Sequence, residues 1–263
     1  MSIALITPTG GRPNQIEMCR HFMQRQTYTG TVVWIITDDC QPRTTDHITN
    51  DFREGWTVIK LYPHPPWRPG MNTQARNIEE GINCLLINYA AADIEAIFII
   101  EDDDYYRPIY LERMMARLQN YKVLGEMNTI YYNVLYRTYF VNRNTSHSSL
   151  FQVAIRPEMV PLFASCYHEK FIDFKFYEKL HAQEYVRRGE VGFFNENNLA
   201  VGIKGIIGRG GIGAGHGKLM NMLPDPHMNW LQTQIPIEDA KLYEGYYRAD
   251  RVSQQPLFTR KRL

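Results

Sequence analysis

Short apolar runs alternate with helical segments in the first half of the chain, and this alternation limits the folds that the sequence can adopt. The opening run "SIALITPT" stops at "GGRP", and an amphipathic helix is expected to follow it. Strands are expected at residues 2–9, 31–39, 56–62 and 95–100, and helices at residues 16–25 and 73–89. Strands separated by helices predict an α/β fold with a mostly parallel sheet and flanking helices, as in the doubly wound class.

Composition narrows the class of protein. Hydrophobic residues make up 44% of the chain, which is enough to bury a substantial core. The 29 Lys and Arg residues balance the 28 Asp and Glu residues, so overall charge gives no reason to expect a nucleic-acid or membrane partner. The cysteines lack CxxC spacing, which argues against a zinc site or a disulfide framework. Without an apolar run of membrane-spanning length or a signal peptide, we expect a soluble cytoplasmic protein.

Four consecutive carboxylates, Glu101 to Asp104, follow the fourth expected strand. Such a cluster is costly unless a positive charge neutralises it, and a divalent cation would do so. Carboxylate oxygens suit Mg²⁺ or Mn²⁺, and such an ion can bridge the phosphates of a nucleoside diphosphate and stabilise it as a leaving group. The alternative is a solvated acidic turn. Because ligands collect at the carboxyl ends of parallel strands, where "TPTGGR" and "TDD" also lie, we favour the metal site.

The segment "FIIEDDDYYRPIYL" resembles the DxD region of GT-A glycosyltransferases, in which an acidic motif follows a core strand. The resemblance implies a Rossmann-like GT-A fold and transfer of a sugar from a nucleotide-sugar donor, with Mn²⁺ or Mg²⁺ as cofactor. Two frames of the motif stay open, Glu101 to Asp103 and Asp102 to Asp104. The distance to Pro108 favours the first, in which Asp103 is the main metal ligand, and Asp104 is the alternative.

Other motifs resemble glycosyltransferase family 2 in the same order along the chain. "ITPTGGRP" resembles the first donor-binding loop, "TDD" the acidic end of the second strand, and "ARN" the Ala-Arg-Asn signature. The resemblance implies that Asp38 contacts the base of the donor. The full set of implied donor-binding residues in these motifs is Thr7, Thr9, Gly10, Arg12, Asp38, Arg76, Asn77, Glu101 and Asp102. Two departures are the turn "DDCQP", where the family more often has Asp-Asp-Gly-Ser, and the lack of an evident Glu-Asp acceptor motif.

The second half of the chain has a less regular pattern. Residues 129–142 and 148–157 are expected to form strands, and residues 171–188 a helix. Because no repeat or linker divides the chain, we expect a single GT-A domain over residues 1–263. The resemblance implies a nucleotide-sugar-binding half at residues 1–115 and an acceptor-side half at residues 116–263, with a glycine-rich lid near residues 205–218.

An inverting transfer needs a side chain that deprotonates the acceptor hydroxyl. In "YHEKFIDFKFYEKL", Asp173 lies among apolar residues and resembles the position of the base in GT-A enzymes, with Glu169 in reserve. The alternative is that Asp173 is an ordinary carboxylate at the start of a helix, where the helix dipole stabilises it. Stereochemistry stays open, because both inverting and retaining enzymes use this scaffold.

The run "GIIGRGGIGAGHGK" is rich in glycine and predicts a mobile loop. Its GxGxxG string, which begins at Gly208, does not follow the first strand, so we do not interpret it as a dinucleotide fingerprint. We expect a lid that closes over the donor phosphates, with Arg209 and Lys218 offsetting their charge. His216 in this run is a candidate metal ligand, and His147 competes with it.

Two other functions share part of this pattern. A sugar-phosphate nucleotidyltransferase would need a longer first loop with a lysine, and a non-catalytic module would bind the donor without turnover. The sequence does not specify the acceptor. It does not specify the donor nucleotide either, but uridine diphosphate is the common one among the resembling enzymes. A hydroxymethylated base in viral DNA is one candidate acceptor, reached through a basic patch, and an ordinary solvated tail is the alternative to that patch. The patch would contain Arg187, Arg188, Arg248, Arg251 and the terminal "TRKRL".

Overall fold

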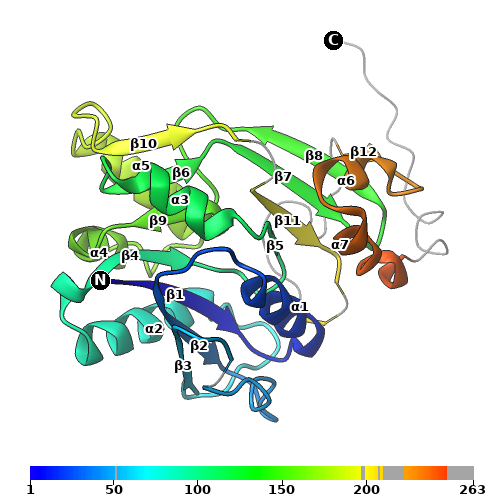
Figure 1. Ribbon diagram of the computed structural model, residues 1–263, viewed down its shortest axis with the longest axis horizontal. Coiled ribbons are helices and arrows are strands. Elements are labelled where there is room, and N and C mark those ends of the chain that lie inside the picture. The colour runs from blue at the N-terminus through cyan, green and yellow to red at the C-terminus, as the bar shows by residue number, and fades with distance from the viewer. Residues whose placement is uncertain (51, 197–198, 207, 210–221, 248–263) are drawn as a thin grey trace.

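The computed structural model describes residues 1–50, 52–196, 199–206, 208–209 and 222–247. A seven-stranded sheet with the order β10-β6-β9-β4-β1-β2-β3 lies at its centre (Figure 1). In this sheet β9 runs antiparallel to both of its neighbours and the other pairs are parallel, so the predicted mostly parallel α/β sheet is confirmed. Its strands are β1 (Ser2–Thr9), β2 (Thr31–Asp38), β3 (Trp56–Leu61), β4 (Ile94–Ile99), β6 (Val123–Glu126), β9 (Val153–Ile155) and β10 (Val191–Phe194).

Apolar side chains on both faces bury the centre of this sheet. In β1, Ile3 and Leu5 belong to the hydrophobic cluster on one face, and Ala4 and Ile6 belong to the cluster on the other. A parallel sheet that is covered on both faces has strands that read as uninterrupted apolar runs. This explains why the local sequence predicted β1 and β2 almost with their observed bounds.

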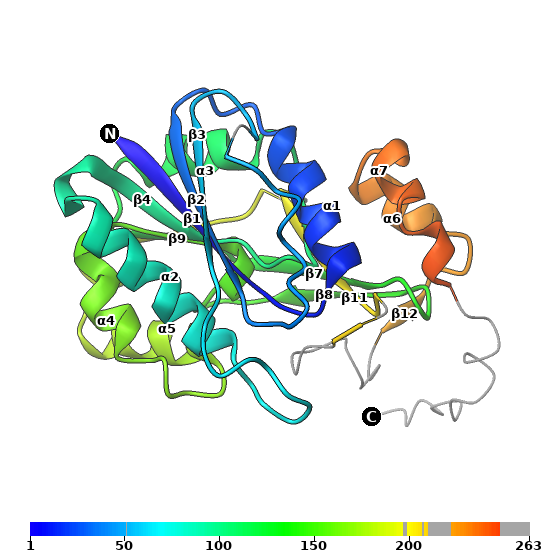
Figure 2. The same cartoon turned by 90° about the horizontal axis from the view of Figure 1, so that it is seen from below.

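Helices cover both faces of the sheet (Figure 2). One face carries α2 (Gln74–Asn88), α4 (Val160–Ala164) and α5 (Ile172–Ala182), and the other carries α1 (Pro13–Gln24) and α3 (Tyr110–Leu118). α1 begins earlier than expected because Pro13 fits the first turn of a helix. α5 ends before the expected residue 188, because Glu184 has a left-handed backbone with φ 61° that a helix does not continue. Single 3-10 turns lie at Ala91–Asp93, Leu150–Gln152, Pro157–Met159 and Glu244–Tyr246.

A second, five-stranded sheet has the order β12-β8-β7-β11-β5. Its strands are β5 (Tyr105–Tyr106), β7 (Asn128–Asn133), β8 (Thr138–Arg143), β11 (Ala200–Lys204) and β12 (Leu223–Pro224). The expected strand at residues 129–142 is therefore a hairpin, with a turn in which Arg137 has φ 50°. Of the expected strand at residues 148–157, only Val153–Ile155 forms a strand, because a 3-10 turn precedes it.

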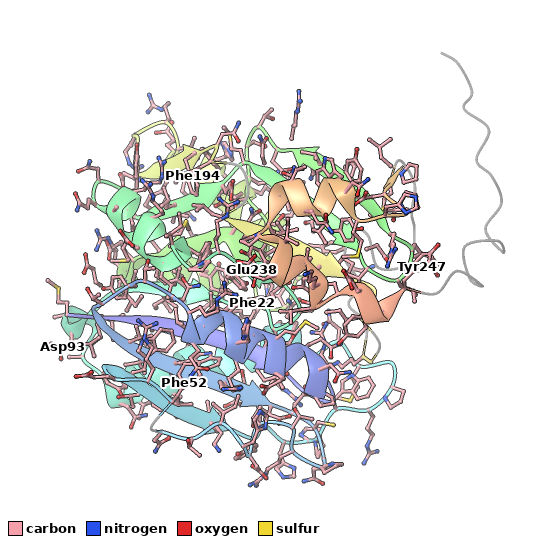
Figure 3. All side chains as sticks on the ribbon, turned by 45° about the vertical axis from the view of Figure 1, so that its right-hand side comes forward. Phe22, Phe52, Asp93, Phe194, Glu238 and Tyr247 are labelled. Carbon is pink, nitrogen blue, oxygen red and sulfur yellow. The ribbon has the colours of Figure 1, made fainter. Side chains whose placement is uncertain are left out.

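The C-terminal helices α6 (Asn229–Gln234) and α7 (Ile237–Lys241) pack beside α1 and the second sheet. Figure 3 shows α7, which carries Glu238, next to α1, which carries Phe22. Arg25 at the end of α1 forms an ion pair with Asp239, and the Tyr105 hydroxyl donates a hydrogen bond to the same carboxylate over 3.1 Å. Among the described residues, no helix is both long and apolar enough to cross a membrane. All four cysteines lie in the described part of the chain and are free thiols.

Candidate active site

The strands bring the predicted polar clusters together at one edge of the main sheet. Thr9 at the end of β1 pairs in register with Asp38 at the end of β2, and Glu101 follows the neighbouring β4. A cavity of about 360 Å³ opens at this edge. Its lining includes Thr9, Arg12 and residues 101–103 from the first half of the chain and Tyr131 and Asp173 from the second. The structure therefore joins residues from both halves of the chain in one cavity.

The acidic segment contributes three carboxylates to a potential metal site. One ligand atom from each of Glu101, Asp103 and Asp104 lies within 4.8 Å of the others. Asp103 and Asp104 are buried, and Glu101 is partly exposed to the cavity. Oδ2 of Asp104 is buried and has no hydrogen-bond partner among the described residues. These carboxylates could bind a divalent metal ion.

Asp102 has a different role from its neighbours. Its Oδ2 accepts a hydrogen bond from the Thr9 hydroxyl over 2.6 Å, and its Oδ1 accepts one from Nη1 of Arg12 over 2.5 Å. Nη2 of Arg12 also donates to Oδ2 of Asp103 over 2.7 Å. Burial raises the pKa of Asp102 to about 6, and the Arg12 guanidinium opposes that rise. Arg12 therefore neutralises part of the cluster and ties the first loop to it.

Lys204, which the sequence analysis did not single out, is a second cation of the cluster. Its Nζ donates a hydrogen bond to Oδ1 of Asp104 over 2.9 Å and lies 3.9 Å from Oδ2 of Asp103. The side chain is 5% exposed and lines the cavity. Burial lowers the pKa of Lys204, but the carboxylates of Asp103 and Asp104 more than offset this and leave it above its ordinary value. Lys204 therefore carries a positive charge near neutral pH.

The carboxyl groups of the cluster outnumber these two cations, and burial makes their negative charge costly. It raises the pKa of Glu101 to about 7, although Lys204 lowers it, and it raises the pKa of Asp104 well above its ordinary range. Four carboxyl groups face Arg12 and Lys204. A further cation would therefore stabilise the ionised cluster.

Asp38, which ends β2, and the adjacent Asp39 have different hydrogen-bond partners. Asp38, the predicted base contact, accepts hydrogen bonds from the backbone and side chains of Thr44 and Thr45 and from the Cys40 backbone. Its carboxylate is thus fully engaged by its own loop. Asp39 instead accepts hydrogen bonds from Thr73 and, over 3.1 Å, from Nη2 of Arg76.

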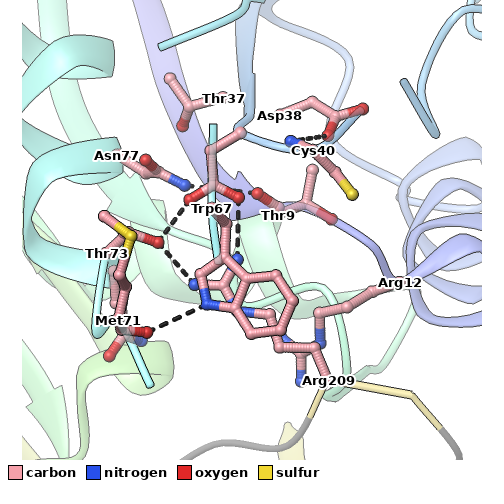
Figure 4. Close-up of polar contacts among 12 residues, drawn as sticks. Thr9, Arg12, Thr37, Asp38, Cys40, Trp67, Met71, Thr73, Asn77 and Arg209 are labelled. Atoms are coloured by element: carbon pink, nitrogen blue, oxygen red, sulfur yellow. Dashed lines mark hydrogen bonds and ion pairs between the residues drawn. The ribbon is translucent and has the colours of Figure 1, made fainter. Parts of the chain in front are cut away.

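Arg209 completes the surroundings of Asp39. Its Nη1 donates to Oδ1 of Asp39 over 2.8 Å, and its guanidinium carbon lies 4.7 Å from the centre of the Trp67 ring (Figure 4). Gly10 lies so close that an added Cβ would fall 1.9 Å from Oδ1 of Asp39, so a side chain does not fit there. Trp67 and Arg209 both line the cavity. The predicted residues Gly10, Arg76 and Arg209 therefore meet around Asp39, which the sequence analysis passed over in favour of the adjacent Asp38.

The two candidate bases differ in position. Asp173 lies in the first turn of α5 and lines the cavity, and its Oδ1 accepts a hydrogen bond from the Phe174 backbone over 2.9 Å. Burial raises the pKa of Asp173, and the hydrogen bond from Phe174 opposes that rise. Glu169 pairs with the exposed His168 over 3.3 Å and is not among the described residues that line the cavity. The geometry therefore favours Asp173.

The remaining predicted residues have varied positions. Thr7 is buried and accepts a hydrogen bond from Nε1 of Trp34 over 2.9 Å, whereas Asn77 lines the cavity and donates to the Thr9 carbonyl over 3.3 Å. His147 packs edge-to-face on Phe174, with 5.6 Å between ring centres. Residues 207 and 210–218 of the expected lid, which include His216 and Lys218, lie outside the described residues.

Solved structures with a similar fold include one of S. aureus TarS. The structure of TarS 1–349 in complex with UDP has a TM-score of 0.52 and 13% sequence identity, over 77% of this chain and 60% of that chain. A second structure of TarS 1–349 has a TM-score of 0.50 with the same identity and coverage. This chain thus matches less than two thirds of the length of these structures. This similarity confirms the predicted GT-A fold. No protein-family model and no curated protein matches the sequence.

Proposed function

We propose that this protein is a metal-dependent glycosyltransferase that moves a sugar from a nucleoside diphosphate sugar to a hydroxyl group of an acceptor. The observation that carries the proposal is the convergence of Glu101, Asp103 and Asp104, of which Glu101 and Asp103 line one cavity together with Asp173. The fold supports it, because a structure of similar fold, that of TarS, contains UDP. We propose uridine diphosphate as the nucleotide of the donor for the same reason.

The residues of the cluster fit a divalent cation. Three carboxylate groups converge, and the buried Oδ2 of Asp104 has no hydrogen-bond partner in the described part of the chain. Oxygen ligands of this kind suit Mn²⁺ or Mg²⁺. When bound, such an ion would neutralise charge on the departing diphosphate. In this proposal Asp103 is the main ligand, with Glu101 and Asp104 beside it.

In the proposed transfer, Asp173 is the proton acceptor. The acceptor oxygen forms a bond to the anomeric carbon of the sugar, and its proton moves to the Asp173 carboxylate. The bond between that carbon and the diphosphate oxygen breaks, and the diphosphate leaves with the bonding electrons. A base works best when its pKa is close to the working pH, and burial moves the pKa of Asp173 in that direction. This route predicts inversion at the anomeric carbon.

Asp39 is more closely connected to the cavity than Asp38. The Asp38 carboxylate is engaged by Thr44 and Thr45, whereas Asp39 is in contact with Arg209, which lines the cavity. We propose that Arg209 binds the nucleotide portion of the donor and that Asp39, whose carboxylate accepts hydrogen bonds from Thr73 and Arg209, positions it.

The described part of the expected basic patch does not favour DNA as the acceptor. Arg187 pairs with Glu184 over 2.7 Å, and Arg188 pairs with Glu190 over 2.5 Å, so each positive charge is locally offset. Arg248 and Arg251 lie outside the described residues. The proposal therefore specifies an acceptor with a hydroxyl group and does not include DNA as that acceptor.

The test is the release of nucleoside diphosphate from a panel of nucleotide sugars with Mn²⁺, by the native chain, by Asp103→Ala and by the matched control Asp93→Ala. Asp93 is exposed in a 3-10 turn at the opposite end of β4. We expect metal-dependent release by the native chain and the control, and loss of release in Asp103→Ala. Donor binding without release would identify a non-catalytic module. If no nucleotide sugar is bound or consumed with any metal, the proposal is wrong.

A further inference from the structure

Lys204 is an internal cation of the acidic cluster. Its Nζ lies 2.9 Å from Oδ1 of Asp104 and 3.9 Å from Oδ2 of Asp103. The rings of Tyr131 and Phe151 lie 5.8 Å and 5.9 Å from the same atom. The side chain is 5% exposed, so these carboxylates and rings, and not bulk water, surround the ammonium group. Because Lys204 also lines the cavity, its charge is available to a ligand that binds there.

The backbone holds Lys204 and Asp104 in place independently of their ion pair. Lys204 ends β11, in register with Asn133 of β7, and its carbonyl accepts a hydrogen bond from the Val134 backbone over 2.8 Å. The Ile203 backbone N–H donates to Oδ1 of Asp104 over 2.9 Å. Asp104 therefore keeps one fixed hydrogen bond even without the lysine. Its other oxygen, Oδ2, has no hydrogen-bond partner among the described residues.

Lys204 and a divalent ion would share the same carboxylates. At an effective dielectric constant of about 20, unit charges about 5 Å apart repel enough to change a binding constant by roughly two orders of magnitude. Loss of a residue that hydrogen-bonds to a metal ligand has the opposite effect and weakens metal binding by about ten- to a hundredfold. Because the Ile203 N–H still orients Asp104, the repulsion should be the larger effect of Lys204.

We propose that Lys204 is a binding residue for the diphosphate group of the donor and that it makes divalent-ion binding depend on that group. Without the diphosphate, the positive charge of the lysine lies beside Asp103 and Asp104 and opposes binding of the ion. With it, the phosphate charges offset both cations, so the metal and the donor nucleotide bind as a strongly coupled pair. This inference rests on the proposed function. It adds that Lys204 couples the binding of the metal to the binding of the diphosphate.

The test measures Mn²⁺ affinity by calorimetry with and without UDP, after correction for the complex that Mn²⁺ and UDP form in solution. The proteins are the native chain, Lys204→Met and the control Lys170→Met, which removes another lysine of the same cavity. We expect UDP to strengthen Mn²⁺ binding to the native chain and to the control by about a hundredfold. In Lys204→Met we expect tighter Mn²⁺ binding without UDP and a coupling factor at least tenfold smaller.

Lys204→Gln gives a second measurement if the methionine variant does not fold, because glutamine still donates a hydrogen bond to Asp104 without a charge. Lys204→Arg, which keeps the charge, is expected to retain the native coupling. The same coupling in the native chain and in the folded neutral variant would overturn the inference and leave the proposed function intact. Equal Mn²⁺ affinity with and without bound UDP in the native chain would also overturn it, whether or not any variant folds. Absence of UDP binding by the native chain would count against the proposed donor itself.

Discussion

Nη1 of Arg209 lies 2.8 Å from Oδ1 of Asp39, although 170 positions separate the two residues along the chain. The Arg209 guanidinium also lies over the Trp67 ring, and its Nη2 donates to the Thr73 hydroxyl over 2.5 Å. These contacts fix a positive charge at the cavity, beside the loop that follows β2. Charge-assisted hydrogen bonds of this kind are stronger than neutral ones.

Arg209→Ala is expected to weaken UDP binding by about ten- to a hundredfold, because a charged hydrogen-bonding partner of the nucleotide contributes about 1.5–3 kcal/mol. The melting temperature should change little, since Asp39 keeps its hydrogen bonds from Arg76 and Thr73. Calorimetric titration with UDP measures the first effect and differential scanning fluorimetry the second. Arg187→Ala, which removes an exposed arginine that pairs with Glu184, is the matched control. Unchanged UDP affinity in Arg209→Ala would remove Arg209 from the donor site.

Asp173→Asn is expected to lower the transfer rate by about a hundredfold or more while leaving UDP affinity within about twofold, because it removes the proton acceptor but keeps the shape of the side chain. In the native chain the base must be deprotonated, so activity should rise with pH through the raised pKa of Asp173. The part of this acid limb that comes from Asp173 should disappear in the variant, whereas any part that comes from Glu101 or Asp102 should remain. Glu169→Gln is the control. If Asp173 only stabilises the start of α5, the variant will lose stability without this loss of rate.

Phe171 presents an aromatic surface beside the proposed base. It is 47% exposed, lines the cavity and lies two residues before Asp173. Phe171→Ala is expected to raise the KM for the acceptor by about tenfold, the effect of losing a ring that an acceptor would cover. Hydrolysis of the nucleotide sugar by water, which needs no acceptor, should be unchanged. Phe174→Ala is the control, because Phe174 is also exposed but contacts His147. Equal KM values for the acceptor in the two variants would show that Phe171 does not contact the acceptor.

Local sequence patterns predicted the first half of the fold because its elements are local. β1, β2 and α2 have patterns of apolar residues that match their own period, and their polar ends were placed correctly at one edge. The second sheet depends on pairings between distant segments, such as β11 with β7 and with β5. No local pattern encodes such a pairing. The hairpin at residues 129–142 is local, but its turn "VLYR" contains none of the residues that usually mark a turn, so the hairpin was interpreted as a continuous strand.

The two site residues that sequence reasoning missed show the same limit. Lys204 ends an ordinary apolar strand, "AVGIK", and only the pairing of β11 brings its ammonium group to Asp104. Asp39 follows an identical residue, and its direction depends on the turn after β2, where Thr44 and Thr45 engage Asp38. The departure of "DDCQP" from the family pattern was the one signal that this turn is unusual. Composition and motif order give no information on the direction in which the side chain of Lys204 or Asp39 points.

Glu126 is a buried carboxyl group outside the cavity. Its Oε2 accepts a hydrogen bond from Nε2 of Gln152 over 2.9 Å, and its Oε1 has no hydrogen-bond partner among the described residues. Burial raises its pKa from 4.5 to about 9. Because the folded-state pKa lies above the unfolded-state value, the protonated group stabilises the fold below pH 4.5, and this contribution is lost as the pH rises toward about 9.

Glu126→Gln keeps the shape of the side chain and removes the need to retain a proton on burial. The free energy of unfolding of the native chain should therefore fall more steeply between about pH 5 and pH 9 than that of the variant. Near pH 7 the variant should be more stable by about 1–3 kcal/mol, since each unit of pKa difference corresponds to about 1.4 kcal/mol. Urea unfolding at several pH values measures both effects, with exposed Glu54→Gln as the control. Parallel pH profiles for the native chain and Glu126→Gln would show that Glu126 is ionised in the folded protein.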